Sequence, residues 1–219
     1  MITILGDVHG KEKECLKVIE ENEYVVQVGD LGFNYDYLKN VDTDKFRFIG
    51  GNHDNWDTLL CKAYTPGYLG RYGVHTMNGI KFFYISGGYS IDDGYRREHR
   101  ARGGAASWWH QEELNFSEME ACKKLYLEEK PEILLTHSPC RYTISDMTNS
   151  RIVEKFGFDK DFYCQTSHFY DHLFMCHKPK LHIAGHMHKS YYNVNKGIAC
   201  LGLAELETFD LTQSFIDSL

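Results

Sequence analysis

Short apolar runs recur along the chain, and each of them predicts a buried strand. The clearest runs are Ile2–Leu5, Tyr24–Val28, Phe46–Ile49, Ile133–Leu135 and Leu181–Ala184. After the first run, the segment from about Lys11 to Glu21 predicts an amphipathic helix whose apolar face consists of Cys15, Leu16, Val18 and Ile19. Because strand, polar turn and helix alternate, the pattern predicts an α/β fold with a parallel or mixed sheet.

The middle of the chain has a different pattern. Val74–Met77 and Ile80–Ile85 predict a β-hairpin, because Asn78-Gly79 between them is a preferred two-residue turn. Residues 89–106 are expected to form a long loop, within an arginine-rich insertion near 88–107.

The second half is expected to return to helices and strands. Ser107 is expected to cap a helix from about Trp108 to Glu129, and a further helix is expected from about Ser167 to Cys176. Residues 140–164 between them have no clear periodicity and are expected to be irregular. Short strands are expected at Tyr191–Val194, Ile198–Leu203 and Thr208–Leu211.

Length and composition limit what the chain can be. The 219 residues fit a single domain that spans 1–219. No apolar run reaches about 18 residues and no secretory leader is visible, so we expect a cytoplasmic protein with no membrane partner. Seven cysteines without a Cys-x-x-Cys pair argue against a disulfide framework and a zinc knuckle. The net charge of −7 argues against an extended grip on duplex DNA.

Polar side chains suited to metal binding follow five of the predicted strands. They are Asp7 and His9, Asp30, Asn52 and His53, His137, and His186 and His188. Because ligands gather outside the carboxyl ends of strands in open α/β sheets, we expect these side chains to converge. Carboxylates and imidazoles suit first-row divalent ions, and the lack of cysteine ligands argues against a closed structural zinc site. Without His53, seven candidate ligands remain, and they predict two ions about 3.5–4 Å apart that share a carboxylate.

The segment Gly51–Asp54 links a predicted strand to a predicted helix. We interpret Asn52 as a metal ligand, His53 as the residue that handles a proton or a charge, and Asp54 as the group that orients His53. Taken alone, Asn and Asp at the start of a helix are more often capping residues, and that interpretation stays open. The four other strand ends favour the functional interpretation.

Five blocks of the sequence resemble the signature blocks of the calcineurin-like metallophosphoesterases. They occur in the family's order at Gly6–Gly10, Gly29–Gly32, Gly51–Asp54, Thr136-His137 and Gly185–His188. The resemblance implies a four-layer αββα sandwich of two mixed sheets, with a two-metal site at the carboxyl ends of the strands. It also implies that the ions are manganese, iron, zinc or nickel, of which we favour manganese.

The resemblance assigns a role to each candidate residue. Asp30 would bridge the two ions, and His53 would stabilise the phosphoryl transition state or protonate the leaving group while Asp54 holds its ring. The remaining ligands would divide between the ions, with Asp7, His9 and His188 at the first and Asn52, His137 and His186 at the second.

At two positions the sequence differs from the serine/threonine phosphatase branch of this family. The serine/threonine phosphatase branch has an arginine soon after the second block and a glutamate at the end of the third, whereas this chain has Phe33-Asn34 and Asp54. The segments Gly87–Asp92 and Ser107–Trp109 are similar instead to a bacterial and phage-type subgroup, and the resemblance brings no substrate with it. These features favour a nucleotide or nucleic-acid substrate over a phosphoprotein.

Arginines and a histidine in the 89–106 segment are candidate substrate contacts. Arg97 could hold a phosphate with two hydrogen bonds, and Arg96 and His99 are further candidates. With Arg100 and Arg102 they would suit a short single-stranded nucleic acid. The alternative is a solvated loop without a ligand.

The sequence therefore predicts a two-metal phosphoesterase that hydrolyses phosphomonoesters or phosphodiesters. A hydroxide that bridges the ions would attack phosphorus, and His53 would assist the leaving group. One alternative is a protein phosphatase of the serine/threonine type. The other is a non-catalytic scaffold of the same fold, and the presence of His53 and every candidate ligand argues against it.

Overall fold

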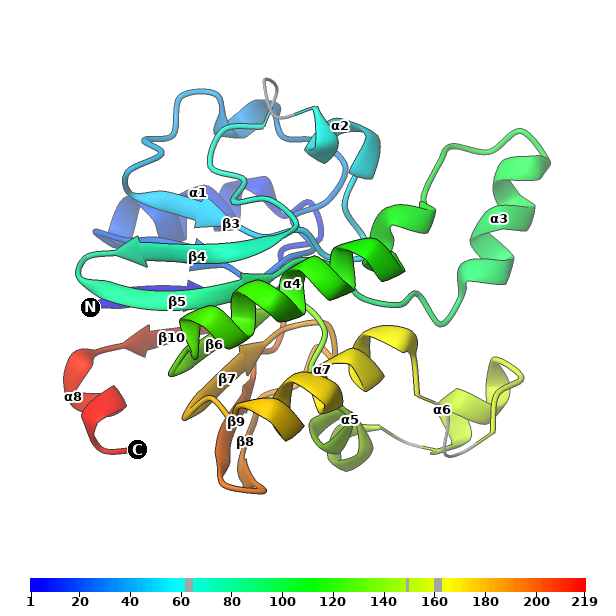
Figure 1. The fold of residues 1–219 in the computed structure, drawn as a ribbon. Coiled ribbons are helices and arrows are strands. Elements are labelled where there is room, and N and C mark those ends of the chain that lie inside the picture. Colours follow the sequence, from blue (N-terminus) through cyan, green and yellow to red (C-terminus); the bar gives the residue numbers. More distant parts are fainter. Residues whose placement is uncertain (62–64, 149, 160–162) are drawn as a thin grey trace.

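Two sheets form the centre of the protein in the computed structural model, which describes residues 1–61, 65–148, 150–159 and 163–219 (Figure 1). The four-stranded sheet has the order β10-β1-β2-β3, with β1 Ile2–Leu5, β2 Val25–Gln27, β3 Phe46–Phe48 and β10 Thr208–Leu211. The six-stranded sheet has the order β4-β5-β6-β7-β9-β8, with β4 Tyr72–Met77, β5 Ile80–Ile85, β6 Ile133–Thr136, β7 Leu181–Ala184, β8 Tyr191–Asn195 and β9 Ile198–Gly202. Both sheets are mixed: β10, β4 and β8 pair antiparallel with their neighbours, and the other pairs are parallel.

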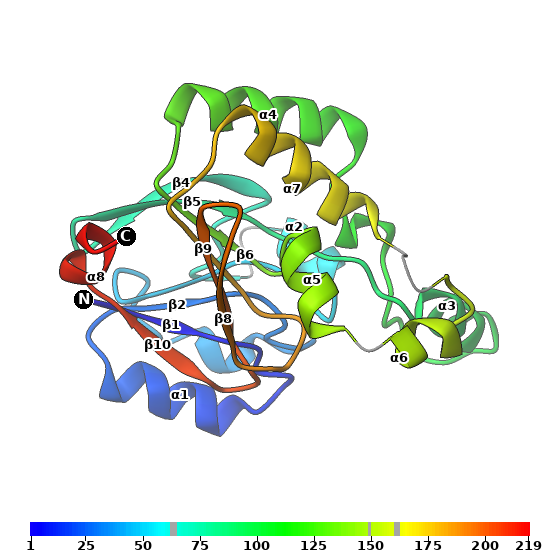
Figure 2. The ribbon, with the colours of Figure 1, turned by 90° about the horizontal axis from the view of Figure 1, so that it is seen from below.

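Helices cover the outer faces of both sheets. Figure 2 shows α4 (Phe116–Glu129) and α7 (Gln165–Cys176) over the six-stranded sheet, and α1 (Glu12–Glu21) under the four-stranded sheet. The predicted four-layer αββα sandwich is therefore confirmed, as is the α/β class.

The alternation of side chains along each strand divides the apolar residues between two buried faces. On β6, Ile133 and Leu135 lie in the core between the sheets, whereas Leu134 lies in the core beneath α4 and α7. On β1, Ile4 lies between the sheets and Leu5 packs in the core on the α1 side. Because both faces of these strands are buried, their sequences are continuous apolar runs, which is why the runs predict strands well.

The expected loop at residues 89–106 contains a helix, α3 (Asp93–Ala101). Its sequence has no apolar stripe, and Arg96 is its buried residue, so hydrophobic periodicity could not reveal it. Pairs of opposite charge four residues apart support it instead: Arg97 with Asp93 at 3.0 Å, and Arg96 with the preceding Asp92 at 2.7 Å.

The long helix expected from Trp108 begins later in the structure. The α4 helix starts at Phe116, and Asn115 caps it through a reciprocal capping box with Glu118. The predicted cap at Ser107 is wrong, because a 3₁₀ turn at His110–Glu112 lies between Ser107 and the start of α4.

The segment expected to be irregular contains two short helices, α5 (Arg141–Met147) and α6 (Ser150–Lys155). Positions 149 and 160–162 of this segment lie outside the described residues. Further short helices are α2 (Trp56–Leu60) and α8 (Gln213–Asp217), the second of which follows β10. None of the helices in the described ranges has the length and apolar character that a membrane span needs.

Candidate metal centre

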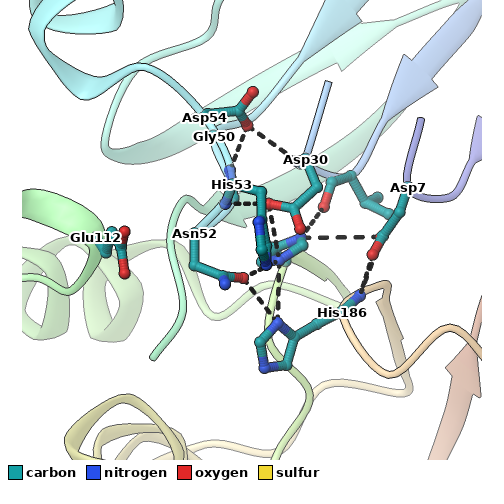
Figure 3. A network of polar contacts seen from close by, with 12 residues as sticks. Asp7, Asp30, Gly50, Asn52, His53, Asp54, Glu112 and His186 are labelled. Atoms are coloured by element: carbon teal, nitrogen blue, oxygen red, sulfur yellow. Dashed lines mark hydrogen bonds and ion pairs between the residues drawn. The ribbon is translucent and has the colours of Figure 1, made fainter. Parts of the chain in front are cut away.

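The predicted ligands come together where strands of both sheets end. The parallel strands β1, β2 and β3 deliver Asp7, Asp30 and Asn52, and the parallel strands β6 and β7 deliver His137 and His186. Figure 3 shows these loops meeting, with Asn52 and His186 directed toward one another from different sheets. All seven candidate ligands lie in one cluster.

The first half of the cluster contains two carboxylates and two imidazoles. The ligand atoms of Asp7, His9, Asp30 and His188 all lie within 4.8 Å of one another. His9 Nε2 is 2.8 Å from His188 Nε2, and Asp7 Oδ2 is 3.1 Å from His188 Nε2. Four donors of this kind at this spacing can surround one divalent ion.

The second half of the cluster consists of Asn52, His137 and His186. Asn52 Oδ1 is 2.9 Å from His137 Nε2 and 2.9 Å from His186 Nδ1, and the two ring nitrogens are 3.2 Å apart. Asp30 lies between the halves: its Oδ1 is 3.3 Å from His137 Nε2 and its Oδ2 is 3.8 Å from His9 Nε2.

Lone pairs face one another in this second half. His137 Nδ1 is 3.0 Å from the carbonyl oxygen of Val28, which can only accept, so Nδ1 carries the proton and Nε2 carries a lone pair in the neutral ring. Nε2 nevertheless lies next to the oxygens of Asn52 and Asp30. Atoms with lone pairs at these distances repel unless a cation lies among them, and the backbone contact fixes the tautomer that metal ligation needs.

Asp30 provides a second sign that the residues fit a metal. Its Oδ1 accepts a hydrogen bond from the backbone N–H of His53 at 2.6 Å, while its buried Oδ2 has no hydrogen-bond partner in the described part of the chain. Burial, followed by the charges of Asp7 and Asp54, raises the pKa of Asp30 well above its usual value. A divalent ion would satisfy the orphaned oxygen and favour the ionised carboxylate.

The backbone is strained at four candidate ligands. His9, Asp30, His186 and His188 have φ angles of 50°, 60°, 70° and 52°, in the left-handed region that residues with side chains rarely adopt. Such conformations cost free energy and concentrate at functional sites. The left-handed backbone at these residues directs their side chains toward the candidate metal centre.

Glycines allow the carboxylates to approach the backbone of the neighbouring loops. A Cβ atom on Gly51 would lie 2.1 Å from Asp30 Oδ1, and one on Gly185 would lie 2.1 Å from Asp7 Oδ1. No side chain fits at either position, which explains in physical terms why glycine precedes Asn52 and His186 in the two motifs.

A relay of hydrogen bonds fixes the amide of Asn52. Its Nδ2 donates to Ser90 Oγ at 3.0 Å, and Ser90 Oγ donates its single proton to Glu112 Oε2 at 2.6 Å. Because Ser90 can only accept from the amide, Asn52 must turn its oxygen toward the histidines. Sequence reasoning missed Ser90, which contacts Asn52 directly, and Glu112, which acts on Asn52 through Ser90.

Ser90→Ala is expected to weaken metal binding without removing a ligand. Loss of an outer hydrogen bond of this kind costs roughly 10- to 100-fold in metal affinity. Titration of the metal-free protein with Mn²⁺ measures the change. Ser167→Ala, which removes another buried serine hydroxyl on α7, should leave the affinity unchanged, and equal losses in the two variants would contradict the relay.

The buried carboxyl of Glu112 is expected to make the stability of the protein depend on pH. Burial raises the pKa of Glu112 to about 8. A carboxyl with a raised pKa in the folded state binds a proton on folding, so the free energy of unfolding decreases as pH rises from about 4.5 to about 8. Glu112→Gln should flatten this decrease, and urea unfolding at both ends of the range measures it. An unchanged slope would contradict the raised pKa.

The catalytic candidate His53 lies beside an arginine. Arg96 Nη2 is 2.9 Å from His53 Nδ1 and 2.8 Å from Nε2. Arg96 is itself held by Asp92 Oδ1 at 2.7 Å and by the carbonyl oxygen of Ser107 at 2.9 Å. Burial and the charge of Arg96 lower the pKa of His53, which keeps the ring neutral. Since a guanidinium only donates, it can donate to only one of these two nitrogens, the one with the lone pair, and the other nitrogen of the neutral ring carries the proton.

The predicted contact between Asp54 and the His53 ring is wrong. Asp54 Oδ2 accepts from the backbone N–H groups of Asp30 at 2.9 Å and Gly51 at 2.7 Å, and Oδ1 accepts from the N–H of Gly32 and the hydroxyl of Tyr35. Figure 3 shows its carboxylate apart from the ring of His53. Asp54 therefore connects two loops of the centre, and Arg96 contacts the ring in its place.

The other candidate substrate contacts lie away from the centre. Arg97 is exposed, pairs with Asp93 and has its guanidinium carbon 5.1 Å from the centre of the Trp108 ring, where both line a separate surface hollow. His99 is exposed and stacks on Tyr95, with 6.4 Å between the ring centres. Of the three candidates, Arg96 is the one that the structure brings to the cluster.

A cavity of about 720 Å³ opens beside the cluster. Its polar wall includes Asn52, His53, Arg96, His186 and His188. The cavity also has apolar lining residues, which come from α5, α6, the loops beside them and the segment before α3: Ile91, Ile144, Met147, Val153, Phe156 and Tyr163. These residues had no recognisable pattern in the sequence.

The family model for the calcineurin-like phosphoesterases matches residues 1–190. The chain belongs to the calcineurin-like phosphoesterases. It is therefore a metal-dependent hydrolase of phosphoric esters, and the cluster of Asp7, His9, Asp30 and His188 is a candidate site for its metal.

Several solved structures are similar to this chain at low sequence identity. The phosphopantetheinyl hydrolase PptH from Mycobacterium tuberculosis is 14% identical, with a TM-score of 0.51 over 93% of this chain and 89% of that one. An archaeal phosphodiesterase is 13% identical, with a TM-score of 0.39 over 93% and 83% of the two chains. GAP50 of Plasmodium, described as the anchor in the inner membrane complex, is 12% identical, with a TM-score of 0.45 over 93% and 71%. No curated protein matches the sequence.

Proposed function

We propose that the protein is a two-metal phosphoesterase that acts on small phosphoesters such as nucleotides. The position of Asp30 carries the proposal, because its carboxylate lies between two groups of ligands and its buried Oδ2 lacks a hydrogen-bond partner among the described residues. Asp7, His9 and His188 would hold one ion, Asn52, His137 and His186 would hold the other, and Asp30 would bridge them. When bound, the ions increase the acidity of a water nucleophile and balance negative charge on the phosphoryl oxygens.

The chain's own residues supply orientation and a hydrogen-bond donor. Arg96 Nη2 lies within hydrogen-bond distance of both nitrogens of the His53 ring, and it would donate to the one that carries the lone pair, while the other nitrogen carries the proton. That N–H would donate to a phosphoryl oxygen or to the departing oxygen. Arg96 also lines the cavity, where its positive charge attracts the phosphate.

The cavity supports a small-molecule substrate over a phosphoprotein. Its volume of about 720 Å³ is within the range of about 300–1,000 Å³ that small ligands occupy. The apolar lining offers Tyr163 and Phe156 for contact with a base or another apolar group next to the phosphate. The exposed Arg97 and Trp108 would extend this surface for a short single-stranded nucleic acid.

Two assays on the manganese-loaded protein test the proposal. Para-nitrophenyl phosphate and its bis ester separate monoesterase from diesterase activity. A panel of cyclic nucleotides, dinucleotides, short oligonucleotides and a phosphopeptide then defines the substrate. We expect turnover of nucleotide phosphoesters, with two ions per chain. Preference for the phosphopeptide would favour a protein phosphatase, and two bound ions without turnover of any phosphoester would favour a scaffold.

A further inference from the structure

A second group of metal-binding side chains lies behind the six-stranded sheet, outside the candidate metal centre. The ligand atoms of Cys140, His182 and Cys200 all lie within 4.8 Å of one another, and each residue is only 1% exposed. We infer that these three residues form a site for a thiolate-preferring divalent ion, with Zn²⁺ as the best fit. The inference does not depend on the proposed function.

The sheet topology brings the three residues together. His182 on β7 and Cys200 on β9 are register partners in a parallel pair, so their side chains stand next to each other on the same face. Cys140 follows β6, which neighbours β7 on its other side, and it stands immediately before α5. The fold therefore brings His182 together with two cysteines that are 60 residues apart in the sequence. Because these cysteines form no Cys-x-x-Cys pair, the sequence did not reveal the cluster.

Hydrogen bonds fix which nitrogen of His182 can bind an ion. Thr136 Oγ1 donates its single proton to the carbonyl oxygen of Ser138 at 2.7 Å. Its contact with His182 Nε2, also 2.7 Å, must then be an N–H donation from the ring. The neutral ring consequently carries its lone pair on Nδ1. A histidine whose other nitrogen donates to a fixed oxygen is arranged as metal-bound histidines are.

Charge and surroundings favour zinc. Two thiolates balance the charge of Zn²⁺, so the complex is neutral, as a site with apolar walls requires. The walls include Tyr170 and Phe174, whose ring centres are 5.9 and 5.5 Å from that of His182. The hydroxyl of Thr143, 3.4 Å from Cys140 Sγ, offers a fourth donor.

Binding requires two proton transfers and no change in oxidation state. Cys140 and Cys200 each lose a thiol proton to solvent, and the ion exchanges water for two sulfurs and one nitrogen. Contact between the two thiols lowers the pKa of Cys140 and, together with burial, raises the pKa of Cys200, so the ion itself must displace the proton of Cys200. Since the ligands are buried, the ion would enter as the chain folds.

Cobalt substitution tests the site in the full-length protein. Protein produced in cobalt-supplemented medium should show a near-ultraviolet charge-transfer band from thiolate to Co²⁺, which the candidate metal centre cannot give because it has no cysteine ligand. The band should be lost in Cys200→Ser and retained in Cys122→Ser, which changes a buried cysteine in the same helix-side core. Absence of the band in the unchanged protein, or its persistence in Cys200→Ser, would overturn the inference.

X-ray absorption at the zinc edge tests it without a variant. With manganese in the candidate centre, zinc-loaded protein should show about two sulfur neighbours at about 2.3 Å. A shell of only nitrogen and oxygen would overturn the inference. So would a disulfide between Cys140 and Cys200, which thiol counting after denaturation detects as two missing thiols.

Discussion

Replacing Asp30 with alanine is expected to empty the metal centre and to lower kcat/KM by about 1,000-fold or more. The physical reason is that Asp30 Oδ1 lies 3.3 Å from His137 while Oδ2 lies 3.8 Å from His9, so one substitution removes a ligand from both halves of the cluster. Metal catalysis contributes several kcal/mol of transition-state stabilisation, and each 1.36 kcal/mol is tenfold in rate. Elemental analysis and steady-state kinetics measure the two effects.

Two further variants test whether the loss of metal and activity in Asp30→Ala comes from the loss of the bridging carboxylate. Asp30→Asn keeps an oxygen for the His53 backbone N–H but loses the charge, so it should keep the fold and lose metal. Asp44→Ala removes an exposed carboxylate elsewhere and should change neither quantity. If Asp30→Ala retained both ions and the full rate, the bridging role would be wrong.

The sequence predicts the strands that are buried on both faces. It does not predict helices that are held by charged side chains and have no apolar stripe. Central strands such as β6 and β7 are buried on both faces, so they appear as continuous apolar runs. The α3 helix has ion pairs and one buried arginine instead of an apolar stripe, so it has no hydrophobic period. Short helices such as α5 depend on tertiary contacts more than on their own pattern.

The residues of the candidate metal centre were also only partly predictable from the sequence. Residues such as Asp30 and His137 follow strands directly, so the sequence order of strands and polar turns is enough to bring them together. Ser90 and Arg96 approach the centre from the segment after β5, whose path depends on hydrogen bonds to Gly50 and to Glu112 of the 3₁₀ turn. The role predicted for Asp54 failed because adjacency in sequence says nothing about the direction of a side chain in a tight turn.

His53→Ala is expected to lower kcat by about 100- to 10,000-fold while both ions stay bound, because the N–H of the neutral His53 ring would hydrogen-bond the departing oxygen and His53 contributes no ligand. The size of the loss should depend on the leaving group. Para-nitrophenolate departs without a proton, so its bis ester should lose least, whereas an alkyl ester with a basic leaving oxygen should lose most. Equal losses on both substrates would assign His53 to charge stabilisation, and loss of metal in the variant would contradict either role.

Arg96 provides the matched test of how His53 is held. Arg96→Ala removes the guanidinium that contacts the ring and the positive charge that, after burial, lowers the pKa of His53. The pKa of His53 should therefore rise, and the acid limb of the pH–rate profile should move to higher pH. Arg97→Ala removes a charge of the same helix that points to another surface, so its profile should stay in place. A common shift in both variants would mean that the net charge of α3 acts on the site, whereas a shift in Arg96→Ala alone requires the direct contact.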